Sequence, residues 1–315
     1  MSYYIGIDLG GTNTKIGIVN KEGNILKSQI IKTFSEAGVE ETIKRIWESV
    51  KKIAQEVEIE ISEIKGIGVG IPGPVVNQSI VTFFANFNWE RNINLKEKFE
   101  TLTGIKTRIE NDANIIAQGE AIFGIAKGYS SSITVAVGTG IGGGIFIDGK
   151  LISGMSGVGG EVGHIKLVKD GKLCGCGQKG CFEAYASSKS LEEEALLRIK
   201  TNKNNLLYEK RKENLELLET KDIFECANKG DKFSQDLIEY ESDYLAMGIG
   251  NLLNILNPEI IVLSGGISLA KDNILIPLKE KLKAYAIPPA LEKLKIETGS
   301  LGNEAAIKGA VALFF

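Results

Sequence analysis

Apolar stretches with strand character alternate along this chain with stretches of helical spacing. The segment from Ile5 to Val19 is apolar apart from a central Gly/Thr turn, which predicts two strands joined by a hairpin, and another apolar segment starts at Ile25. Between Glu40 and Glu56 the apolar positions recur at the spacing of one helix face, which predicts a helix. Alternating strands and helices indicate an α/β fold.

The glycine hairpin occurs twice. Residues 133–147 repeat the arrangement of residues 5–19, an apolar strand, a glycine-rich turn and a second apolar strand. A turn at Asp148-Gly149 and a strand start at 150–152 follow the second copy, as a turn and a strand follow the first. Two copies about half a chain apart predict two domains with related cores. Chance likeness between two Gly-rich hairpins is the alternative.

The remaining predicted elements continue the alternation of strands and helices. In chain order they are a buried strand over 64–71 stopped by Pro72-Gly-Pro74, a short strand over 106–110, a helix from Asn111 towards Phe123, charged helical segments over 189–243, an apolar helix over 244–256, a strand over 260–267 that enters a glycine turn, and an apolar closing helix over 303–313.

Composition and charge narrow the class of protein. A chain of 315 residues with 43% apolar and 24% charged residues has enough material for two globular domains with a core. The net charge of -3 gives no support to nucleic acid or an anionic membrane as a partner. The N-terminus has no signal-peptide pattern, and five glycines interrupt the longest uncharged stretch, residues 130–147. We therefore expect a cytoplasmic protein.

A candidate metal site stands out. The only histidine, His164, lies shortly before three of the four cysteines, Cys174, Cys176 and Cys181, and glycines fill the gaps between these cysteines. Three thiolates and one imidazole are the ligands of a closed, structural, tetrahedral zinc site. Buried thiols, or a disulfide near an unrelated histidine, are the alternatives. The fourth cysteine, Cys226, lies in a helix-like stretch and is expected to be a small core residue.

Three glycine turns follow strand ends, at Gly10-Gly11-Thr12, Gly138-Thr139-Gly140 and Gly265-Gly266. Such turns bring backbone N–H groups close to an anion, which suits the phosphates of a nucleotide. None has the Walker pattern or a convincing dinucleotide fingerprint, and each taken singly fits a tight hairpin better than a phosphate site. The three turns together favour a nucleotide. Asp8 precedes the first turn, where its carboxylate is suited either to hold Mg²⁺ beside phosphates or to cap its own turn.

Three further carboxylates occupy positions suited to chemistry. Asp112 lies where a strand gives way to a helix, so it is placed either to accept the proton of an attacking hydroxyl or to cap the helix. Glu161 lies three residues before His164, and Glu183 lies two residues after Cys181, so a zinc site would hold both in defined places. Carboxylates accept paired hydrogen bonds from vicinal hydroxyls, which suits a sugar. Solvated or zinc-neighbouring glutamates are the alternative.

Together these segments resemble the ROK family (repressors, open reading frames, kinases), within the actin-like, Hsp70 and sugar kinase superfamily. The resemblance runs from Ile5 to the last helix. The motifs that carry it are Asp8-Leu-Gly-Gly-Thr-Asn-Thr-Lys15, Gly70-Ile-Pro-Gly-Pro74, Asn86-Phe-Asn-Trp89, Glu110-Asn-Asp-Ala-Asn114, Gly138-Thr-Gly-Ile-Gly-Gly-Gly144, Glu161-Val-Gly-His164, the Cys174–Cys181 knuckle with Glu183, and Ser264-Gly-Gly-Ile267.

The resemblance implies two actin-like ATPase-type domains with the active-site cleft between them. The N-terminal domain would cover residues 1–112 and be completed by the C-terminal helix 303–315. The larger C-terminal domain would cover 113–302 and carry the zinc knuckle. A homodimer is the family expectation.

The implied activity is ATP-dependent phosphorylation of a hexose, with the 6-hydroxyl of glucose as the favoured acceptor. N-acetylmannosamine or N-acetylglucosamine kinase and fructokinase are the alternatives, and polyphosphate stays open as a donor. A sugar-responsive repressor is poorly supported, because only four residues precede Ile5. A non-catalytic switch of the actin or Hsp70 kind is a third hypothesis, against which the zinc knuckle and the Asn111-Asp112 pair argue.

The resemblance also implies a role for each matching residue. Asp112 would be the catalytic base, and His164 would turn one ring nitrogen to a structural zinc and the other to a sugar hydroxyl. The sugar would contact Gly73, Asn86, Asn111, Asp112, Glu161, His164 and Glu183. Mg²⁺-ATP would contact Asp8, Gly10, Gly11, Thr12, Asn13, Lys15, Gly138, Thr139 and Gly140, with Gly265 and Gly266 beside the nucleoside. The zinc ligands would be His164, Cys174, Cys176 and Cys181.

Overall fold

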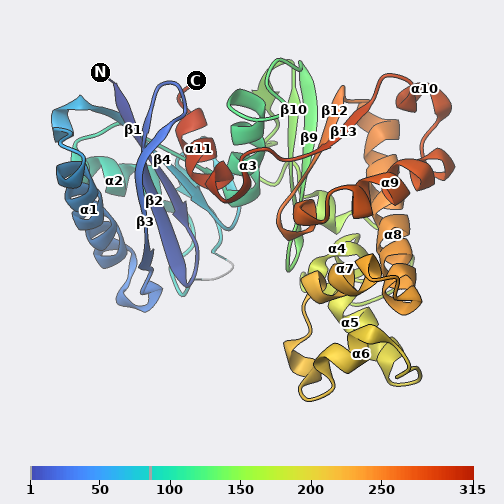
Figure 1. Cartoon of the computed structure of the whole chain (residues 1–315). Helices are drawn as coiled ribbons and strands as arrows, with labels where there is room; N and C mark the ends of the chain where they lie inside the picture. The colour runs from blue at the N-terminus through green and yellow to red at the C-terminus, as the bar shows by residue number, and fades with distance from the viewer. Residues whose placement is uncertain (1, 85–86) are drawn as a thin grey trace. The chain divides into compact units, whose positions relative to one another are not determined.

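The computed structural model describes residues 2–84 and 87–315 (Figure 1). The chain folds into two compact units. The first comprises the described residues up to 134 together with 144–160 and 300–315, and the second comprises 135–143 and 161–299. The predicted α/β class is confirmed, with mixed sheets.

The first unit is built on a five-stranded sheet of order β3-β2-β1-β4-β8. The strands are β1 (Tyr3–Leu9), β2 (Asn13–Asn20), β3 (Ile25–Lys32), β4 (Ile64–Ile71) and β8 (Thr107–Asn111). β1 pairs antiparallel with β2 and parallel with β4, which pairs parallel with β8. Because parallel strands end at the same edge of a sheet, Asp8, Gly70 and Asn111 lie near one edge.

Helices cover the first sheet on both faces (Figure 1). The predicted helix over 40–56 is confirmed as α1 (Val39–Glu56), which buries Ile43, Ile46 and Ile53 at helical spacing. α3 (Asp112–Ile122) packs against the closing helix α11 (Ala305–Ala312), which also contacts β1 and β4. The first unit is completed by α2 (Leu95–Thr103) and a small sheet of β5 (Val75–Val76), β6 (Ile80–Val81) and β7 (Ile93–Asn94).

The second sheet has the order β11-β10-β9-β12-β13, which repeats the layout of the first. Its strands are β9 (Ser131–Val137), β10 (Ile141–Ile147), β11 (Lys150–Leu151), β12 (Ile260–Ser264) and β13 (Lys295–Thr298). β10 pairs antiparallel with β11, as β2 does with β3 in the first sheet, and the last pair, β12 and β13, is parallel, as β4 and β8 are. The predicted duplication of the glycine hairpin is therefore a duplication of the whole sheet.

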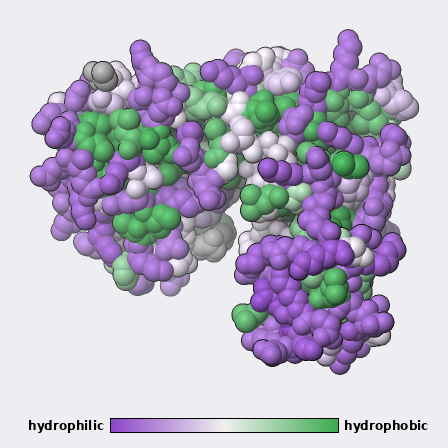
Figure 2. Space-filling model, viewed as in Figure 1, coloured by the Kyte–Doolittle hydropathy of each residue, from purple (hydrophilic) through white to green (hydrophobic). Residues whose placement is uncertain are grey.

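The second unit adds most of the helices. They are α4 (Glu183–Ala186), α5 (Ser188–Ile199), α6 (Leu206–Arg211), α7 (Thr220–Asn228), α8 (Lys232–Leu256), α9 (Asp272–Lys281) and α10 (Pro288–Leu291). The surface over α5 and α6 is mainly hydrophilic (Figure 2), as the charged sequence of this part predicts. Cys226 is buried in α7, which confirms its expected place in the core. None of the described helices combines the length and apolarity that a membrane span needs.

One boundary differs from expectation. The strand predicted over 260–267 ends at Ser264, because Gly265 has a φ of 79° and leads into a 3₁₀ turn over Gly266–Ala270. Residues 113–134 and 144–160 lie in the first compact unit, where α3 packs on α11. The division into domains after residue 112 stays a prediction.

Candidate functional site

The first glycine turn joins β1 to β2 and is closed by its own backbone. Gly10 N donates to Asn13 O at 3.2 Å, and Thr33 Oγ1 donates to Gly10 O at 2.7 Å. Beside the turn, Lys15 Nζ lies 3.1 Å from Asp8 Oδ2, since the two residues are paired across β1 and β2. The turn therefore presents exposed backbone next to one anionic and one cationic side chain.

Asn111 is the N-cap of α3. Its Oδ1 accepts hydrogen bonds from Ala113 N at 2.9 Å and Asn114 N at 3.2 Å, which satisfies two N–H groups that the helix leaves without partners. Its Nδ2 donates to Gly73 O at 3.3 Å. Gly73 has a φ of 118°, a backbone conformation that favours glycine because a Cβ atom would be strained there. The structure thus brings Gly73 and Asn111 together, and the cap holds the start of α3 in place.

Asp112 begins α3 directly after the end of β8. Its side chain is half-buried, and its Oδ1 accepts a hydrogen bond from Ala113 N at 2.9 Å. The carboxylate therefore lies at the strand edge where parallel α/β sheets place reactive groups.

Glu110 is a site residue to which the sequence analysis gave no role. Its side chain is buried, with Oε1 accepting from Asn111 N at 2.9 Å and from Asn114 Nδ2 at 3.0 Å. Its Oε2 accepts from Ser153 Oγ at 3.2 Å. Burial raises the pKa of the Glu110 carboxyl although these hydrogen bonds oppose the shift. Its place in the motif Glu110-Asn-Asp-Ala-Asn114, directly before Asn111 and Asp112, was the available signal.

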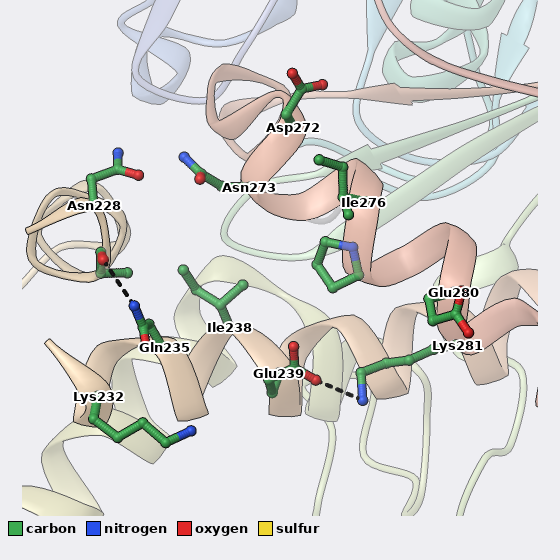
Figure 3. A pocket seen from close by; sticks show the side chains of 12 residues that line it. Asn228, Lys232, Gln235, Ile238, Glu239, Asp272, Asn273, Ile276, Glu280 and Lys281 are labelled. Carbon is green, nitrogen blue, oxygen red and sulfur yellow. Dashed lines mark hydrogen bonds and ion pairs between the residues drawn. The ribbon is translucent and has the colours of Figure 1, made fainter. Parts of the chain in front are cut away.

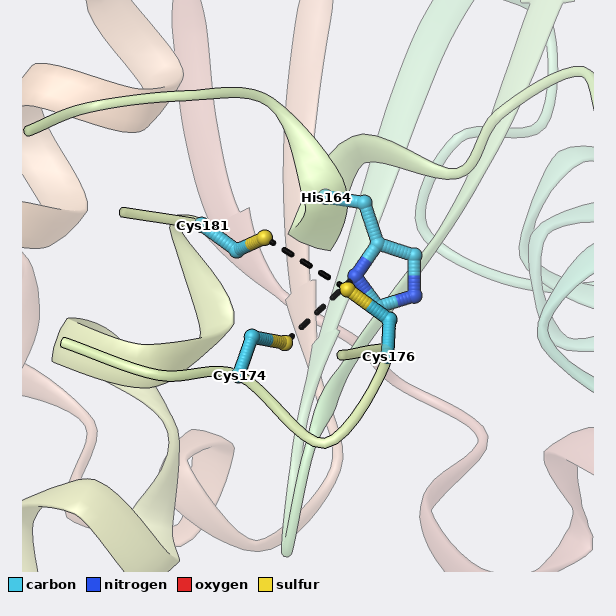
Figure 4. A group of neighbouring side chains, drawn as sticks. All are labelled: His164, Cys174, Cys176 and Cys181. Carbon is cyan, nitrogen blue, oxygen red and sulfur yellow. Dashed lines mark hydrogen bonds between the residues drawn. The ribbon is translucent and has the colours of Figure 1, made fainter. Parts of the chain in front are cut away.

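His164 and three cysteines converge on one point of the second unit (Figure 4). His164 lies in a 3₁₀ turn over Val162–His164, and the cysteines lie in a hairpin that is closed by Cys174 N donating to Gln178 O at 2.8 Å. All four ligand atoms lie within 4.8 Å of one another. The chain therefore holds a Cys₃His cluster, as the spacing of these residues predicts.

The distances within this cluster fit a tetrahedral metal ion. Cys176 Sγ lies 3.7 Å from Cys181 Sγ, and Cys174 Sγ lies 3.8 Å from His164 Nδ1. Zn–S bonds of about 2.3 Å at tetrahedral angles place two sulfurs about 3.8 Å apart. All four cysteines of the chain are free, so the disulfide alternative does not hold. A cation is also favourable here, because burial raises the pKa of the Cys174 thiol to about 12 and a metal offsets that cost of the thiolate.

The other ring nitrogen of His164 faces Glu161. His164 Nε2 lies 3.9 Å from Glu161 Oε2, which is too long for a direct hydrogen bond. Both side chains are partly exposed, at 38% and 42%. A hydroxyl group fits the chemistry of this pair, because it can donate to the carboxylate and accept from the imidazole N–H.

Glu183 lies between the cluster and the second glycine turn. Its Oε2 accepts a hydrogen bond from Ile141 N at 2.9 Å, and its Oε1 lies 3.4 Å from Cys174 Sγ. Oε2 of this predicted sugar ligand thus has a backbone partner, whereas Oε1 has a donor only when Cys174 carries its thiol proton.

The second and third glycine turns line one cavity of about 430 Å³. Gly138 N donates to Gly140 O at 2.9 Å, and Ser188 N donates to Gly138 O at 2.8 Å, which ties the second turn to the start of α5. The walls combine polar side chains with the apolar Phe224 and Leu269, a lining that suits a base and its polar substituents. Among the lining residues are Gly138, Thr139, Ser188, Glu192, Thr220, Gly266 and Asn273.

A separate cavity of about 590 Å³ lies between α8 and α9 (Figure 3). Lys281 and Glu239 form an ion pair at 2.9 Å in its wall, and Gln235 donates to Ala227 O. Asn228 and Asn273 line this cavity and the neighbouring one. Its remaining lining residues match none of the motifs from the sequence analysis.

The predicted site residues thus fall into two groups, one in each unit. The first unit brings together Gly73, Asn111 and Asp112 at one sheet edge and places Asp8, Gly10, Gly11, Thr12, Asn13 and Lys15 at the first turn. The second unit brings together Glu161, His164, Cys174, Cys176, Cys181 and Glu183, with Gly138, Thr139 and Gly140 next to Glu183 and Gly266 near Gly138. Asn86 lies outside the described residues.

Two sheets of the same strand order, each carrying a glycine hairpin, define a two-domain actin-like ATPase fold of the sugar kinase class. The chain belongs to the ROK family, whose sequence pattern matches residues 4–315.

Individual relatives match over nearly the whole chain. The glucokinase of Thermotoga maritima is 34% identical over 310 residues, which cover 98% of this chain and 96% of that protein. The xylose repressor of Bacillus spizizenii is 30% identical over 310 residues, which cover 98% of this chain and 75% of the repressor. The structure of a ROK family glucokinase from Streptomyces griseus, in complex with glucose and AMPPNP, has a TM-score of 0.84, 32% identity and 99% coverage of both chains.

Proposed function

We propose that this chain is an ATP-dependent glucokinase that transfers the γ-phosphate of ATP to the 6-hydroxyl of glucose. The observation that carries the proposal is the full-length similarity to glucokinases, one of them seen with glucose and a nucleotide analogue. The local geometry supports the same conclusion, because Asp112 lies at the carboxyl edge of the first sheet and a hydroxyl-binding pair lies in the second unit.

Asp112 is the proposed catalytic base. Phosphoryl transfer depends mainly on positioning and charge stabilisation, so an ordinary carboxylate suffices to take the hydroxyl proton late in the reaction. Glu110 and Asn111 keep Asp112 in place, since both bond the backbone at the start of α3. Their contribution is orientation of the base rather than proton transfer.

Glu161 and His164 are the proposed ligands of sugar hydroxyls. The 3.9 Å between His164 Nε2 and Glu161 Oε2 leaves both atoms able to hydrogen-bond a hydroxyl of the substrate. Asn111 and Gly73 belong to the same proposed sugar site, where the hydrogen bond between them fixes the pocket wall.

Zinc is the proposed metal of the Cys₃His cluster. When bound, it supplies a fixed positive charge and a rigid link between the turn at His164 and the cysteine hairpin. His164 Nδ1 and the sulfurs of Cys174, Cys176 and Cys181 would hold it. The ring of His164 is then oriented with Nε2 towards Glu161, which prepares this nitrogen for a sugar hydroxyl.

The glycine turns are the proposed phosphate sites. Backbone N–H groups at Gly10–Thr12 and Gly138–Gly140 are suited to phosphate oxygens, and Asp8 to Mg²⁺ beside them. The cavity of about 430 Å³ next to Gly138 and Gly266 is of the size for a nucleoside.

The proposal is tested by measuring ADP release with Mg²⁺-ATP and glucose, mannose, fructose, N-acetylglucosamine or N-acetylmannosamine. We expect glucose to have the highest kcat/KM, because the glucokinases share the full length of the chain. A highest value for an N-acetylated sugar moves the function to amino-sugar phosphorylation with the same site residues. Absence of turnover with all five sugars contradicts the kinase proposal.

A further inference from the structure

Glu183 lies against both the Cys₃His cluster and the second glycine turn, and its hydrogen bond is to the turn. Oε2 accepts the hydrogen bond of Ile141 N at 2.9 Å, and Oε1 lies 3.4 Å from Cys174 Sγ. Ile141 directly follows Gly140, and Glu183 is 42 residues away in the sequence. One half-buried side chain therefore bridges two segments that the sequence analysis treated as separate sites.

Packing reinforces this bridge on both sides. A Cβ atom at Gly140 would collide with Glu183 Oε2, so the carboxylate lies directly against the turn. A Cβ atom at Gly163 would collide with Ile141 O, so the backbone next to His164 is also in close contact with Ile141. Residues 140–141 are therefore contacted from two sides of the cluster, by Gly163 next to His164 and by Glu183 next to Cys174.

The far end of the turn has a different support. Ser188 N donates to Gly138 O at 2.8 Å, and this bond involves no residue of the cluster. The peptide between Gly140 and Ile141 is held on its carbonyl side within the turn, where Gly138 N donates to Gly140 O at 2.9 Å, and on its N–H side by Glu183. The start of the turn is also bonded to the start of α5. Hydrogen bonds to a carboxylate are among the stronger ones in proteins, so loss of this one releases the end of the turn.

We propose that Glu183 is a positioning residue. It fixes the second glycine turn relative to the metal cluster, so that a change in the cluster alters the conformation of the turn and its affinity for nucleotide. The expected change in nucleotide affinity rests on the proposed function, in which residues 138–140 bind phosphate. The expected change in the conformation of the turn is independent of the proposed function. A ligand of sugar hydroxyls alone would influence sugar binding and leave the turn unchanged.

Two substitutions separate these roles. Glu183→Ala removes the acceptor of Ile141 N, whereas Glu183→Gln keeps a carbonyl oxygen that can accept the same bond. Glu194→Ala is the matched control, because Glu194 is also a half-buried glutamate of the second unit but bonds Lys172 and Arg198 instead. Zinc content is measured for each full-length protein, so that loss of the bridge is distinguished from loss of the metal.

The first measurement is hydrogen exchange of the Ile141 amide in the zinc-loaded protein without nucleotide. We expect exchange to be at least about tenfold faster in Glu183→Ala and wild-type-like in Glu183→Gln and Glu194→Ala. Removal of zinc by a chelator should speed exchange at the same amide while circular dichroism still reports a folded chain. Unchanged exchange in Glu183→Ala overturns the proposal.

The second measurement is calorimetric binding of Mg²⁺-AMPPNP in the absence of sugar. We expect Glu183→Ala to raise Kd about tenfold and Glu183→Gln to raise it less than about twofold. Faster exchange at Ile141 with unchanged Kd overturns the link to nucleotide and leaves the kinase proposal intact. If the wild type does not bind Mg²⁺-AMPPNP while exchange at Ile141 is faster in Glu183→Ala, the proposed function is contradicted. The role of Glu183 in holding the turn is then retained.

Discussion

Three consecutive residues at the end of β8 have three different tasks. Glu110 is buried and bonds the backbone of Asn111, Asn111 caps α3, and Asp112 begins the helix with a half-buried carboxylate. In the sequence these three polar residues are adjacent, and nothing in their order distinguishes their roles. Their burial and partners differ: Glu110 and Asn111 bond the backbone at the start of α3, and Asp112 is the residue to which we assign the proposed role of base.

Asp112→Asn is expected to keep glucose affinity and to lower kcat by about 10²- to 10⁴-fold, because general base catalysis contributes on that scale. The amide keeps the size of the side chain and its ability to accept the Ala113 N–H bond, so the start of α3 should be unaffected. Steady-state kinetics and calorimetric glucose binding check both parts. A variant with near-wild-type kcat would remove Asp112 from the base role.

The four cysteines provide a matched pair of variants for the metal. Cys181→Ser is expected to lower zinc content from about one ion per chain to well below that and to destabilise the protein, because a closed structural site needs all four ligands. Cys226→Ala should retain zinc, since Cys226 lies in the core of α7 outside the cluster. Elemental analysis and thermal unfolding distinguish the two. Equal zinc content in both variants would contradict the zinc assignment.

At the scale of elements, α8 contains a buried group that costs stability. Glu241 is fully buried, and neither of its carboxylate oxygens has a hydrogen-bond partner within the described part of the chain. Burial raises the pKa of Glu241 well above its usual value, and the charge of Lys172 only partly opposes this. The helix therefore carries a carboxyl that stays protonated where an exposed glutamate is ionised.

The resulting pH dependence has a definite sign. Because the folded-state pKa of Glu241 is raised, its protonated form favours folding, and this stabilisation is complete below the unfolded pKa near 4.5 and is lost as pH rises towards the folded value. Glu241→Gln should remove this slope, which is at most about 1.4 kcal/mol per pH unit.

Urea unfolding of wild type and Glu241→Gln between pH 5 and pH 8 measures the difference. The advantage of the variant should grow with pH. Glu239→Gln is the control on the same helix, because Glu239 is exposed and paired with Lys281. Parallel pH profiles for all three proteins would show that Glu241 does not titrate in the expected direction.

At the scale of the whole molecule, the C-terminal segment returns to the first unit at residue 300. The buried carboxylate of Glu120 on α3 receives this segment, accepting from Ser300 N at 3.2 Å, from Ser300 Oγ at 3.2 Å and from Leu301 N at 3.1 Å. It also accepts from Ile125 N at 3.1 Å, beyond the end of α3. α11 then packs on α3 and β1, so residues from both ends of the chain complete one unit.

Glu120→Ala is expected to lower the free energy of unfolding by about 3 kcal/mol, because it removes a buried carboxylate that accepts from three backbone N–H groups and one hydroxyl. Glu304→Ala, which removes an exposed partner of Lys308 in the same segment, should change it by less than about 1 kcal/mol. Urea unfolding curves provide the comparison. A Glu120→Ala variant as stable as this control would show that the segment is held by α11 packing alone.

Features that depend on neighbouring residues could be predicted along the chain. Periodicity predicted α1 and β4 closely, repetition of the glycine hairpin predicted two domains with related cores, and the motifs indicated the ROK family. The grouping of His164 with three cysteines was also predictable, because short glycine-rich spacing brings these residues together locally. Helix and strand preferences and short loops act over a few residues, so they can be recognised along the chain.

Contacts between residues far apart in the sequence could not be predicted and are seen only in the folded chain. Ser153 bonds Glu110 across 43 residues, Ile141 bonds Glu183 across 42, and Ser300 bonds Glu120 across 180. The sequence does not distinguish a glutamate that is solvated at the surface from one that is buried with several hydrogen-bond donors around it. Burial and the choice of partner depend on how sheets and helices pack, and they distinguish Glu110 and Glu183 from solvated acids by giving each a backbone N–H donor.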